Sequence, residues 1–421
     1  SGQSSTRPVK PEPESATPPK LLRYLPAKTR LPAVYRHRPA GSVNRISLSG
    51  TSLARMTNGS RMQLNLPDGQ LYELIQDEVR KDDAGGGIVW VGHLADSANT
   101  NRTVLSLDDK GVDGQITTPK GPLQVESRQG QTWLVDMQTA GLTPGHQQAD
   151  ETTPEDPPAV RSVRGAGRSG GRSIENRYAA QATVSPGGLA VIDLLVAYTP
   201  SLADSGGFRR KLNLLVALAN GAFKDSKIDI SLRLAGIRPV DFADDTDNNQ
   251  ALKHLTRGES GLDMLDSLRQ KKAADAVILL RSFEHASQGG CGSAWVNGSE
   301  GNSMRADLAY AVVSVGTSGD QYCSNYTLAH EVGHILGATH DIDHTTTQGR
   351  FPYAYGYGIE GRFGDIMSYH SPEMGIFANP NLNMCDGLPC GVEDHADLAR
   401  TFNATARIVS GFAAPADNTG L

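Results

Sequence analysis

The sequence predicts a small antiparallel β domain followed by a larger α/β domain. At 421 residues the chain is long enough for two domains with separate cores. Short runs of alternating apolar and polar residues recur from about 43 to 138, and turn residues separate them, as in antiparallel sheets. From about 188 onward, apolar runs of strand length alternate with segments of helical spacing, which indicates the α/β class.

The first 140 residues divide into two predicted parts. Residues 1–40 contain many Pro, Lys and Arg residues and little periodic pattern, so we expect a disordered segment or an extended basic arm. Residues 41–140 form the predicted β domain, in which turn residues bound each alternating run. Strands are expected at 61–66, 88–94, 103–107 and 131–137.

Residues 141–187 are predicted to be a linker rich in Pro, Gly, Asp and Glu. It ends in five arginines spaced among Gly and Ser, namely Arg161, Arg164, Arg168, Arg172 and Arg177. An exposed, unstructured stretch of this kind is a preferred site of proteolysis. We therefore expect the chain to be cut here; an RNA-binding tail is the weaker interpretation, because no aromatic residues accompany the arginines as stacking platforms.

The α/β domain is expected at 188–415. It opens with a strand at 190–198, whose near-continuous apolar run suits the centre of a sheet. A helix is expected at 209–223, where the apolar residues recur at helical spacing. Further strands are expected at 228–234, 275–280, 291–296 and 310–315, and further helices at about 261–271 and 395–412.

One stretch, beginning at His330, reads His-Glu-Val-Gly-His-Ile-Leu-Gly-Ala-Thr-His-Asp. On a helix His330 and His334 project from the same face, one turn apart, and can hold one small divalent ion. Glu331 lies about 100° around the helix, close to such an ion but free to hold a water molecule. Gly337 can adopt the left-handed conformation that ends a helix, which brings His340 round as a third ligand. Three protein ligands and an open position for water are the requirements of a catalytic zinc site.

The alternative without a metal is a helix whose two histidines simply face solvent. The positions of Gly337 and His340 relative to His334 match the longer metal-binding pattern and argue against that alternative. The longer pattern resembles the signature of metzincin metalloproteases. Residues 365–369, Asp-Ile-Met-Ser-Tyr, resemble the Met-turn that underlies the zinc in that clan, with Met367 as its methionine. Asp341 after the third histidine resembles the reprolysin (adamalysin-like) branch, since matrixins carry Ser there and serralysins Pro.

Other short stretches resemble bacterial, secreted reprolysin-like proteases, and the resemblance covers roughly 188–415. They are Cys-Gly-Ser-Ala-Trp at 291–295, Tyr-Ala-Tyr-Gly-Tyr at 353–357 and Phe-Ala-Asn-Pro at 377–380. The chain departs from animal reprolysins at Tyr369, where those proteins usually have Pro. Astacins and serralysins have Tyr at this position, where it ligates zinc or moves to the oxyanion.

The resemblance implies a catalytic domain with a twisted mixed sheet and a zinc-site helix, preceded by a β-rich propeptide. It implies a secreted zinc endopeptidase made as a zymogen, with zinc held by His330, His334 and His340. Glu331 is then the general base, and Tyr369 a hydrogen-bond donor to the oxyanion. A protein or peptide substrate would add as an extended strand beside the edge strand. The residues of that edge strand are Gly292, Ser293, Ala294 and Trp295.

Charge is unevenly distributed along the chain. Residues 1–63 hold 11 Lys and Arg against two Glu, whereas residues 191–421 hold 18 Lys and Arg against 27 Asp and Glu. A basic arm can bind nucleic acid, but we favour a basic segment that rests on the acidic domain of the same chain. No stretch reaches about 18 apolar residues, so no membrane span is expected. The first residues lack the apolar core of a signal peptide, so we expect that any signal peptide has been removed. We also expect the protein to be a monomer.

All four cysteines lie in the second half of the chain, and they allow three pairings. Cys385 and Cys390 bracket a short Asp-Gly-Leu-Pro turn and are the favoured local bridge, which leaves Cys291 to join Cys323. Zinc ligation by the thiols is the rival interpretation, but the histidines already supply a ligand set. Disulfides indicate an oxidising, extracellular compartment.

Several alternatives stay open at this point. A catalytically silent zinc-fold protein that binds or inhibits a partner is the main one, although the intact Glu331 argues against it. The acidic loop at 241–249 can be read as a calcium site, but its spacing matches no known calcium loop. Many metzincin zymogens block the zinc with a cysteine of the propeptide, but the first 290 residues here contain no cysteine. Inhibition would then need another zinc ligand, such as a carboxylate or His93, or the basic arm filling the acidic cleft without touching the metal. Arg350 or Arg362 is a candidate for selecting acidic residues after the cut.

Overall fold

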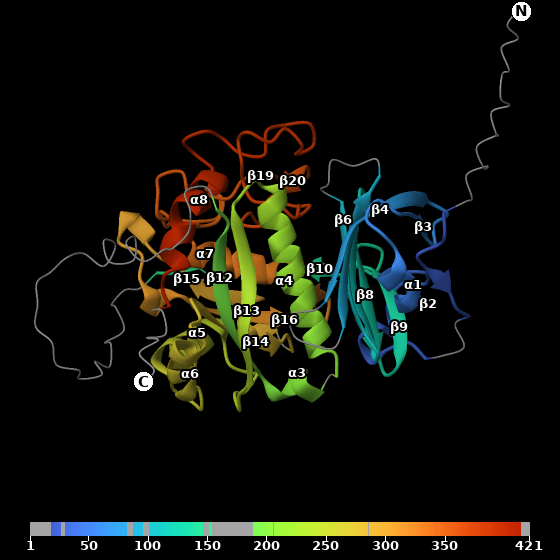
Figure 1. The fold of residues 1–421 in the computed structure, drawn as a ribbon, viewed down its shortest axis with the longest axis horizontal. Helices are drawn as coiled ribbons and strands as arrows, with labels where there is room; N and C mark the ends of the chain where they lie inside the picture. Colours follow the sequence, from blue (N-terminus) through green and yellow to red (C-terminus); the bar gives the residue numbers. More distant parts are fainter. Residues whose placement is uncertain are drawn as a thin grey trace, which may run out of the picture.

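The computed structural model describes residues 18–26, 30–81, 87–95, 101–145, 151–153, 188–204, 206–284 and 286–413. Within them the chain forms a β-rich N-terminal part and a larger α/β part, which lie side by side in Figure 1. The predicted cleavage region, with Arg161 to Arg177, lies outside the described residues. No helix among the residues described is long and apolar enough to cross a membrane.

The N-terminal part is a meander of antiparallel strands in the order β1-β2-β9-β8-β7-β6-β5-β4-β3. A short helix, α1 (Gly50–Arg55), joins β2 to β3. The strands are β1 (Arg23–Tyr24), β2 (Val43–Ser47), β3 (Arg61–Asn65), β4 (Leu71–Lys81), β5 (Ile88–Leu94), β6 (Arg102–Asp108), β7 (Gly111–Thr118), β8 (Gly121–Arg128) and β9 (Gln131–Asp136). From β3 to β9 each strand pairs with the next one along the chain through a short connection, which is the arrangement that alternation and turn residues indicate, whereas β2 pairs with the distant β9.

The two edges of this sheet are joined by the chain that precedes β2. Residues 23–24 pair with β2, and the backbone N–H of Leu21 donates to the Gln63 carbonyl of β3 at 2.8 Å. The predicted arm is therefore extended at 19–24, but it belongs to the sheet. A single turn of 3₁₀ helix, η1 (Ala33–Tyr35), follows and buries Tyr35 completely. The enclosed core is apolar, with Leu64, Leu74, Trp90, Leu105 and Val125 fully buried.

The α/β part is built on a six-stranded sheet in the order β11-β15-β16-β14-β12-β13. All neighbours are parallel except β15 and β16, so the sheet is mixed, as predicted. The strands are β11 (Glu151–Thr152), β12 (Ala190–Tyr198), β13 (Ile230–Pro239), β14 (Ala276–Ser282), β15 (Gly292–Trp295) and β16 (Tyr310–Val315). The helices are α3 (Pro200–Asp204), α4 (Phe208–Asp225), α5 (Asn248–Arg257), α6 (Met264–Lys272), α7 (Thr327–Ile335) and α8 (Leu398–Val409).

Helices cover both faces of the mixed sheet. In β14, Ile278 and Leu280 pack in the same core as α4, α7 and α8, whereas Val277 and Leu279 pack with α5 and α6. A strand buried on both faces gives the continuous apolar run that marked the central strands in the sequence. The remaining elements are short: β10 (Thr143–Pro144), β17 (Thr317–Ser318), β18 (Gln321–Tyr322), β19 (Gly358–Ile359), β20 (Phe363–Gly364), η2 (Ala286–Gln288), η3 (Ser299–Gly301) and η4 (Ala306–Leu308).

The acidic stretch at 241–249 has structural roles, and a calcium site there is not supported. Asp247 caps α5, because its carboxylate accepts from the N–H groups of Asn249 and Gln250 at 3.0 and 3.2 Å. Asp244 lies 3.7 Å from the buried guanidinium of Arg281. The helix that this cap starts, α5, was missed in the sequence because an acidic run suggested a loop.

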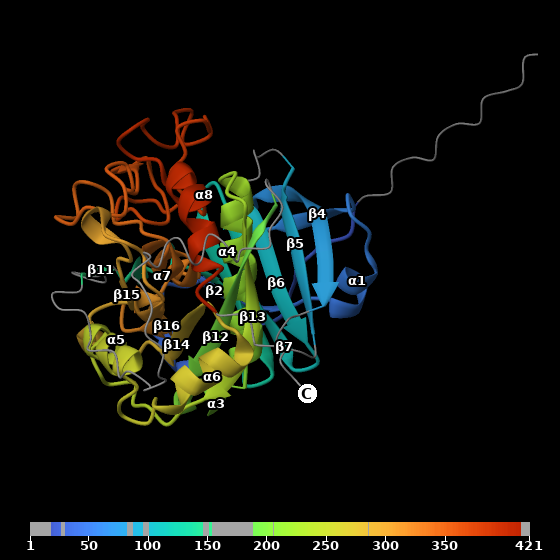
Figure 2. The ribbon, with the colours of Figure 1, turned by 60° about the vertical axis from the view of Figure 1, so that its left-hand side comes forward.

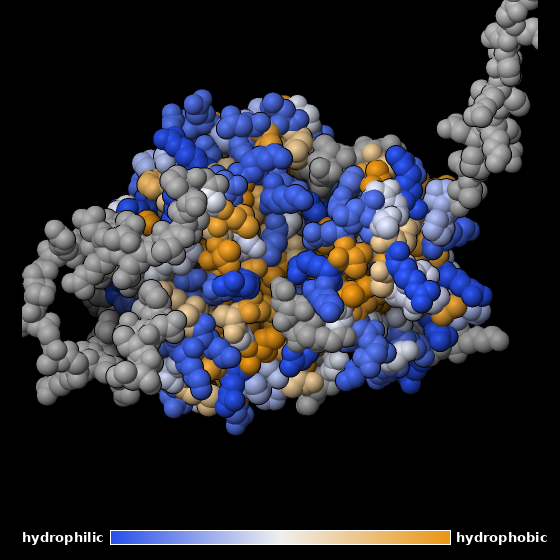
Figure 3. All heavy atoms as spheres, viewed as in Figure 1, coloured by the Kyte–Doolittle hydropathy of each residue, from blue (hydrophilic) through white to orange (hydrophobic). Residues whose placement is uncertain are grey.

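Helix α4 lies between the two sheets and joins the two parts (Figures 1 and 2). It contacts β6 and β7 on one side and β13 on the other, and Val89, Val91 and Val104 share its apolar core. Figure 3 accordingly shows hydrophobic residues toward the middle of the visible face and hydrophilic ones over much of its outer surface. Ion pairs cross the boundary in both directions, from Arg102 to Asp225 at 2.6 Å and from Arg210 to residues 108 and 113 at 2.7 and 2.8 Å.

Candidate metal centre and cleft

The three predicted ligand histidines meet at one point beside α7. His330 and His334 lie one turn apart on that helix, and the chain turns back at Gly337, where φ is 92°. A Cβ at Gly337 would lie 2.7 Å from the Cβ of Arg350, so both conformation and space require glycine. The turn returns the chain to His340, whose Nε2 lies 3.2 Å from Nε2 of His330.

Hydrogen bonds from the outer ring nitrogens orient the imidazoles of His330 and His334. Nδ1 of His330 lies 2.6 Å from the Ile366 carbonyl and Nδ1 of His334 lies 3.0 Å from the Ala338 carbonyl. Because a carbonyl only accepts, both Nδ1 atoms carry the proton and both Nε2 atoms are left to bind a metal. Tetrahedral zinc with bonds near 2.0 Å places neighbouring ligand nitrogens about 3.3 Å apart, close to the spacing found here. These residues fit a zinc ion.

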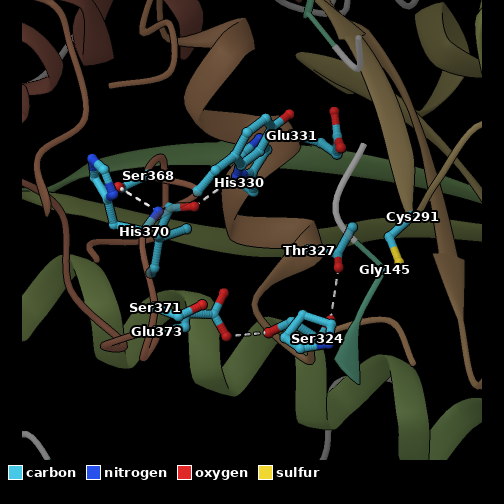
Figure 4. Close-up of a pocket in the computed structure, with 13 residues that line it drawn as sticks. Gly145, Cys291, Ser324, Thr327, His330, Glu331, Ser368, His370, Ser371 and Glu373 are labelled. Atoms are coloured by element: carbon cyan, nitrogen blue, oxygen red, sulfur yellow. Dashed lines mark hydrogen bonds between the residues drawn. The ribbon is translucent and has the colours of Figure 1, made fainter. Parts of the chain in front are cut away.

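Glu331 lies against β15, the predicted edge strand, which in the structure is second to the outermost strand β11. Its side chain is fully buried, and a Cβ added at Gly292 would come within 2.2 Å of its Oε1. Only glycine at this point of β15 leaves room for the carboxylate. Glu331 and His330 line one side of a pocket of about 60 Å³, which Figure 4 shows together with Ser324, Thr327, Ser368 and His370.

The predicted Met-turn packs under α7. Met367 is fully buried, and a Cβ at Gly333 would lie 2.6 Å from its sulfur, so helix and turn are in close contact. Asp365 holds the turn in shape, because its carboxylate accepts from the N–H groups of Met367 at 3.1 Å and Ala378 at 2.7 Å. Burial raises the pKa of Asp365 to about 8.

Tyr369 reaches the metal side of the third histidine. Its hydroxyl lies 3.2 Å from Nε2 of His340, the nitrogen that faces the other two rings. Asp341 holds this loop, because its Oδ2 accepts from the hydroxyl of Ser368 and from the N–H of Tyr369, both at 2.9 Å. The residue after the third histidine thus connects the zinc motif to the Met-turn.

The predicted edge strand β15 borders the cleft, but two of its side chains point elsewhere. Ser293 donates to Asn249 at 2.6 Å and the indole of Trp295 donates to Thr256 at 2.8 Å, so both are directed toward α5. Ala294 is fully buried in the core. What remains for a ligand is the backbone edge of β15, and in this chain that edge pairs in parallel with β11.

Two short pieces of chain that follow the N-terminal sheet, 143–145 and 151–153, lie beside the site, and we call them together the crossing segment. The N–H of Gly145 donates to the Tyr322 carbonyl at 2.8 Å, and Gly145 lines the same pocket as Glu331 (Figure 4). On the far side, the Thr152 carbonyl accepts from the N–H of Val296 at 3.0 Å. The sequence indicated only a linker here, because such short extended pieces carry no periodicity.

Glu151 of the crossing segment lies beside the metal ligands. Its Oε1 accepts from the hydroxyl of Thr345 at 2.5 Å, and its Oε2 accepts from the hydroxyl of Thr339. Oε2 also lies 3.5 Å from Nδ1 of His340. It therefore faces the outer nitrogen of the third ligand, whereas the inner nitrogen faces the metal position.

Other predicted residues take structural positions. The disulfides are Cys291–Cys323 and Cys385–Cys390, the pairing favoured from the sequence, and the first ties the start of β15 to the approach of α7. The guanidinium of Arg350 donates to the carbonyls of Gly301 and Asn302, and Arg362 pairs with Asp386 at 2.6 Å. Neither arginine lines the pocket beside Glu331, so their expected role in selecting acidic residues is not supported. His93 pairs with Asp77 at 2.8 Å.

A mixed sheet, a helix with two candidate ligand histidines, a third such histidine after a glycine turn, and the predicted Met-turn beneath are the features of a metzincin-type metalloprotease domain. Residues 188–396 match the family described as Metallo-peptidase family M12B Reprolysin-like. This domain belongs to the reprolysin-like metalloproteases. Residues 29–140 match a BamI lipocalin-like domain, in keeping with a meander whose edges are joined.

The similar curated proteins are all named peptidyl-Asp metalloendopeptidase. One from Pseudomonas aeruginosa is 28% identical over 249 residues, 52% of this chain and 40% of that protein. One from Stenotrophomonas maltophilia is 30% identical over 233 residues, 52% of each. One from Xanthomonas campestris pv. campestris is 28% identical over 366 residues, 82% of this chain and 80% of that protein. The chain thus spans about half the length of the first two relatives, and most of the third.

Proposed function

We propose that the protein is a zinc-dependent endopeptidase that hydrolyses internal peptide bonds. The observation that carries this proposal is the convergence of three imidazole nitrogens, two of them oriented by backbone carbonyls, beside the buried carboxylate of Glu331. A bound zinc ion would polarise the scissile carbonyl and lower the pKa of a water molecule toward about 7. Glu331 takes a proton from that water and later passes it to the leaving nitrogen.

Tyr369 is proposed to stabilise the oxyanion. Its hydroxyl reaches within 3.2 Å of His340 Nε2, and its loop is fixed by the N–H bond to Asp341. A donor held in place before the reaction costs no reorganisation when charge develops on the substrate oxygen. Removing one such donor typically lowers turnover by about 10²–10³-fold.

The proposed substrates are extended peptides with a small acidic residue at the cut. Strand β15 offers a backbone edge beside Glu331, which suits an added strand. The adjoining pocket is small, about 60 Å³, and much of its lining is short and polar. These polar residues are Ser324, Thr327, Ser368, His370 and Ser371. The small volume of this pocket argues against a large side chain. Glu331 and Glu373 also line it and no Lys or Arg does, so its charge does not select a carboxylate, and the acidic preference rests on the name of the similar proteins.

The N-terminal part is proposed to be a propeptide that keeps the enzyme latent. The crossing segment pairs with the edge of β15 and lines the pocket beside Glu331, so a substrate strand and this segment compete for one place. The sequence left open a carboxylate or His93 as a ligand that blocks the zinc, or the basic arm. Glu151 faces the outer nitrogen of His340 and not the metal position, so we propose that it fastens the crossing segment over the site without ligating zinc. The described part of the basic arm contributes instead to the sheet. We further propose that the enzyme is secreted, because it carries two disulfides.

Assays of the cut and uncut chain test these proposals. After cleavage within 154–187 and removal of the N-terminal part, the domain should hydrolyse casein, and a chelator should abolish the activity. The severed N-terminal part, added back, should inhibit, and more weakly at high salt because ion pairs cross the boundary. A cut domain that binds zinc but hydrolyses no protein would instead be a silent binding protein.

Peptide profiling tests the substrate preference. Peptides that differ only in Asp, Asn or Leu at one position separate recognition of the carboxylate from recognition of shape, because Asn matches Asp in size but lacks the charge. We expect Asp to be cleaved fastest. Equal rates for Asp and Leu peptides would contradict the acidic preference and leave the peptidase proposal standing.

A further inference from the structure

A second cluster of potential metal ligands lies directly beyond the third histidine. Asp341, His344 and His370 each offer a ligand atom, and these atoms lie within 4.8 Å of one another. Within the described ranges, two groups of at least three such side chains meet this condition, and the other is the histidine set of the candidate active site. The second cluster joins the turn after α7 to the loop that follows the Met-turn.

The distances in this cluster suit a small divalent cation. Oδ1 of Asp341 lies 2.7 Å from Nδ1 of His344 and 3.6 Å from Nε2 of His370. Oδ2 of Asp343 adds a fourth potential metal-ligand atom, 3.2 Å from Nε2 of His370. Ligand atoms of a tetrahedral zinc ion lie about 3.3 Å apart, so small side-chain rotations that shift these atoms by roughly half an ångström would bring the set into place.

Outer contacts orient two of these side chains as they do in established metal sites. Oδ2 of Asp341 accepts from Ser368 and Tyr369, which directs Oδ1 toward the two imidazoles. The other nitrogen of His370, Nδ1, lies 3.3 Å from Oε2 of Glu360, a carboxylate–histidine pair of the kind that supports a ligand. Asp341 is 5% exposed and His344 is 37% exposed, so the site is anchored inside and open to solvent on one side.

The local charge also favours a cation. Three carboxylates, from Asp341, Asp343 and Glu360, surround the two imidazoles within 3.6 Å. With neutral imidazoles this group carries three negative charges. A divalent ion would neutralise most of that charge, and imidazole with carboxylate is a donor set that zinc and related ions bind well.

We propose that Asp341, His344 and His370, with Asp343 as a fourth donor, form a second binding site for a divalent cation of the zinc type. The ion clamps the turn after α7 to the loop at 368–370. Tyr369 lies between the two sites, with its ring 4.4 Å from that of His340 and 5.5 Å from that of His344. The clamp therefore also holds Tyr369 in position; this last step rests on the proposed function.

Zinc counting on the full chain tests the site. Metal-free protein is titrated with Zn²⁺, and bound metal is measured by elemental analysis and calorimetry. The unaltered chain should bind two ions, and His344→Gln should bind one, with affinity at the lost site reduced more than about 100-fold because a direct ligand is gone. His254→Gln is the matched control, since His254 is 34% exposed and also pairs with a carboxylate, that of Glu259 at 3.1 Å. This control should bind two ions.

The outcomes separate this site from the proposed active site. One ion in the unaltered chain at saturating Zn²⁺ would show a hydrogen-bond network only, and two ions in His344→Gln would place the extra ion elsewhere; either result overturns the proposal. His330→Gln should lose the active-site ion and keep the second one. A chain that binds two ions as described but hydrolyses no peptide after cleavage within 154–187 and removal of the N-terminal part would sink the proposed function and leave the second site intact.

Discussion

Glu151 is the side chain whose removal should release the cleft most directly. It belongs to the crossing segment, its side chain is 12% exposed, and its carboxylate contacts Thr339, Thr345 and His340. Glu151→Ala leaves the backbone pairing of β11 with β15 in place and removes all three contacts. We expect the uncut variant to spend more time with its cleft open and to hydrolyse small peptides faster than the uncut parent.

The size of the effect follows from the contacts. Each hydrogen bond to an ionised carboxylate contributes about 1.5 kcal/mol, so two hydroxyl contacts amount to about 3 kcal/mol. At about 1.4 kcal/mol per factor of ten, the open fraction would rise about 100-fold. The hydroxyls of Thr339 and Thr345 lie 3.0 Å apart and can bond to each other once Glu151 is gone, which lowers the expected rise toward about tenfold.

Initial rates on a quenched fluorescent peptide, with gels that confirm an uncut chain, provide the assay. Glu259→Ala is the control, because that exposed carboxylate pairs with His254 away from the cleft. After cleavage within 154–187, the parent and Glu151→Ala enzymes have the same sequence and should have equal rates. Equal rates for the uncut parent and the uncut variant, at equal zinc content, would refute the role of Glu151 in latency.

Three further predictions concern the candidate centre itself. Glu331→Gln should keep the active-site zinc while turnover falls by orders of magnitude, whereas His340→Ala should lose both metal and activity; metal analysis beside the peptide assay checks this pair. Tyr369→Phe should lower kcat by about 10²-fold and change KM little, because the oxyanion forms only in the transition state. Since burial raises the pKa of Asp365 to about 8, the folded chain keeps a proton that the unfolded chain releases near pH 4. Stability should therefore fall as pH rises between about 4 and 8, by up to about 1.4 kcal/mol per pH unit, and urea unfolding should show a flatter profile for Asp365→Asn.

Local patterns in the sequence determined much of the fold and the metal-binding residues. Strands at 190–198 and 310–315 have the predicted bounds, because burial on both faces leaves a continuous apolar run. The spacing of His330, His334 and His340 depends on one helical turn and one glycine, which are properties of a dozen neighbouring residues. The meander from β3 to β9 was also predictable, since each of these strands pairs with the next along the chain, whereas the pairing of β2 with β9 joins distant parts of the sequence.

Contacts between distant segments were decided only by the tertiary structure. Glu151 contacts His340 although the two residues are 189 positions apart, and no periodic pattern in the sequence predicts a contact over that distance. Arg350 and Arg362 follow the zinc motif closely in the sequence, but their side chains do not reach the pocket beside Glu331. Arg350 donates to the Asn302 carbonyl and Arg362 pairs with Asp386. Asp341, His344 and His370 join across a turn and a loop only because the Met-turn packs under α7. A sequence reveals chemistry that one helix or strand brings together, whereas chemistry shared by separate elements depends on how the whole chain packs.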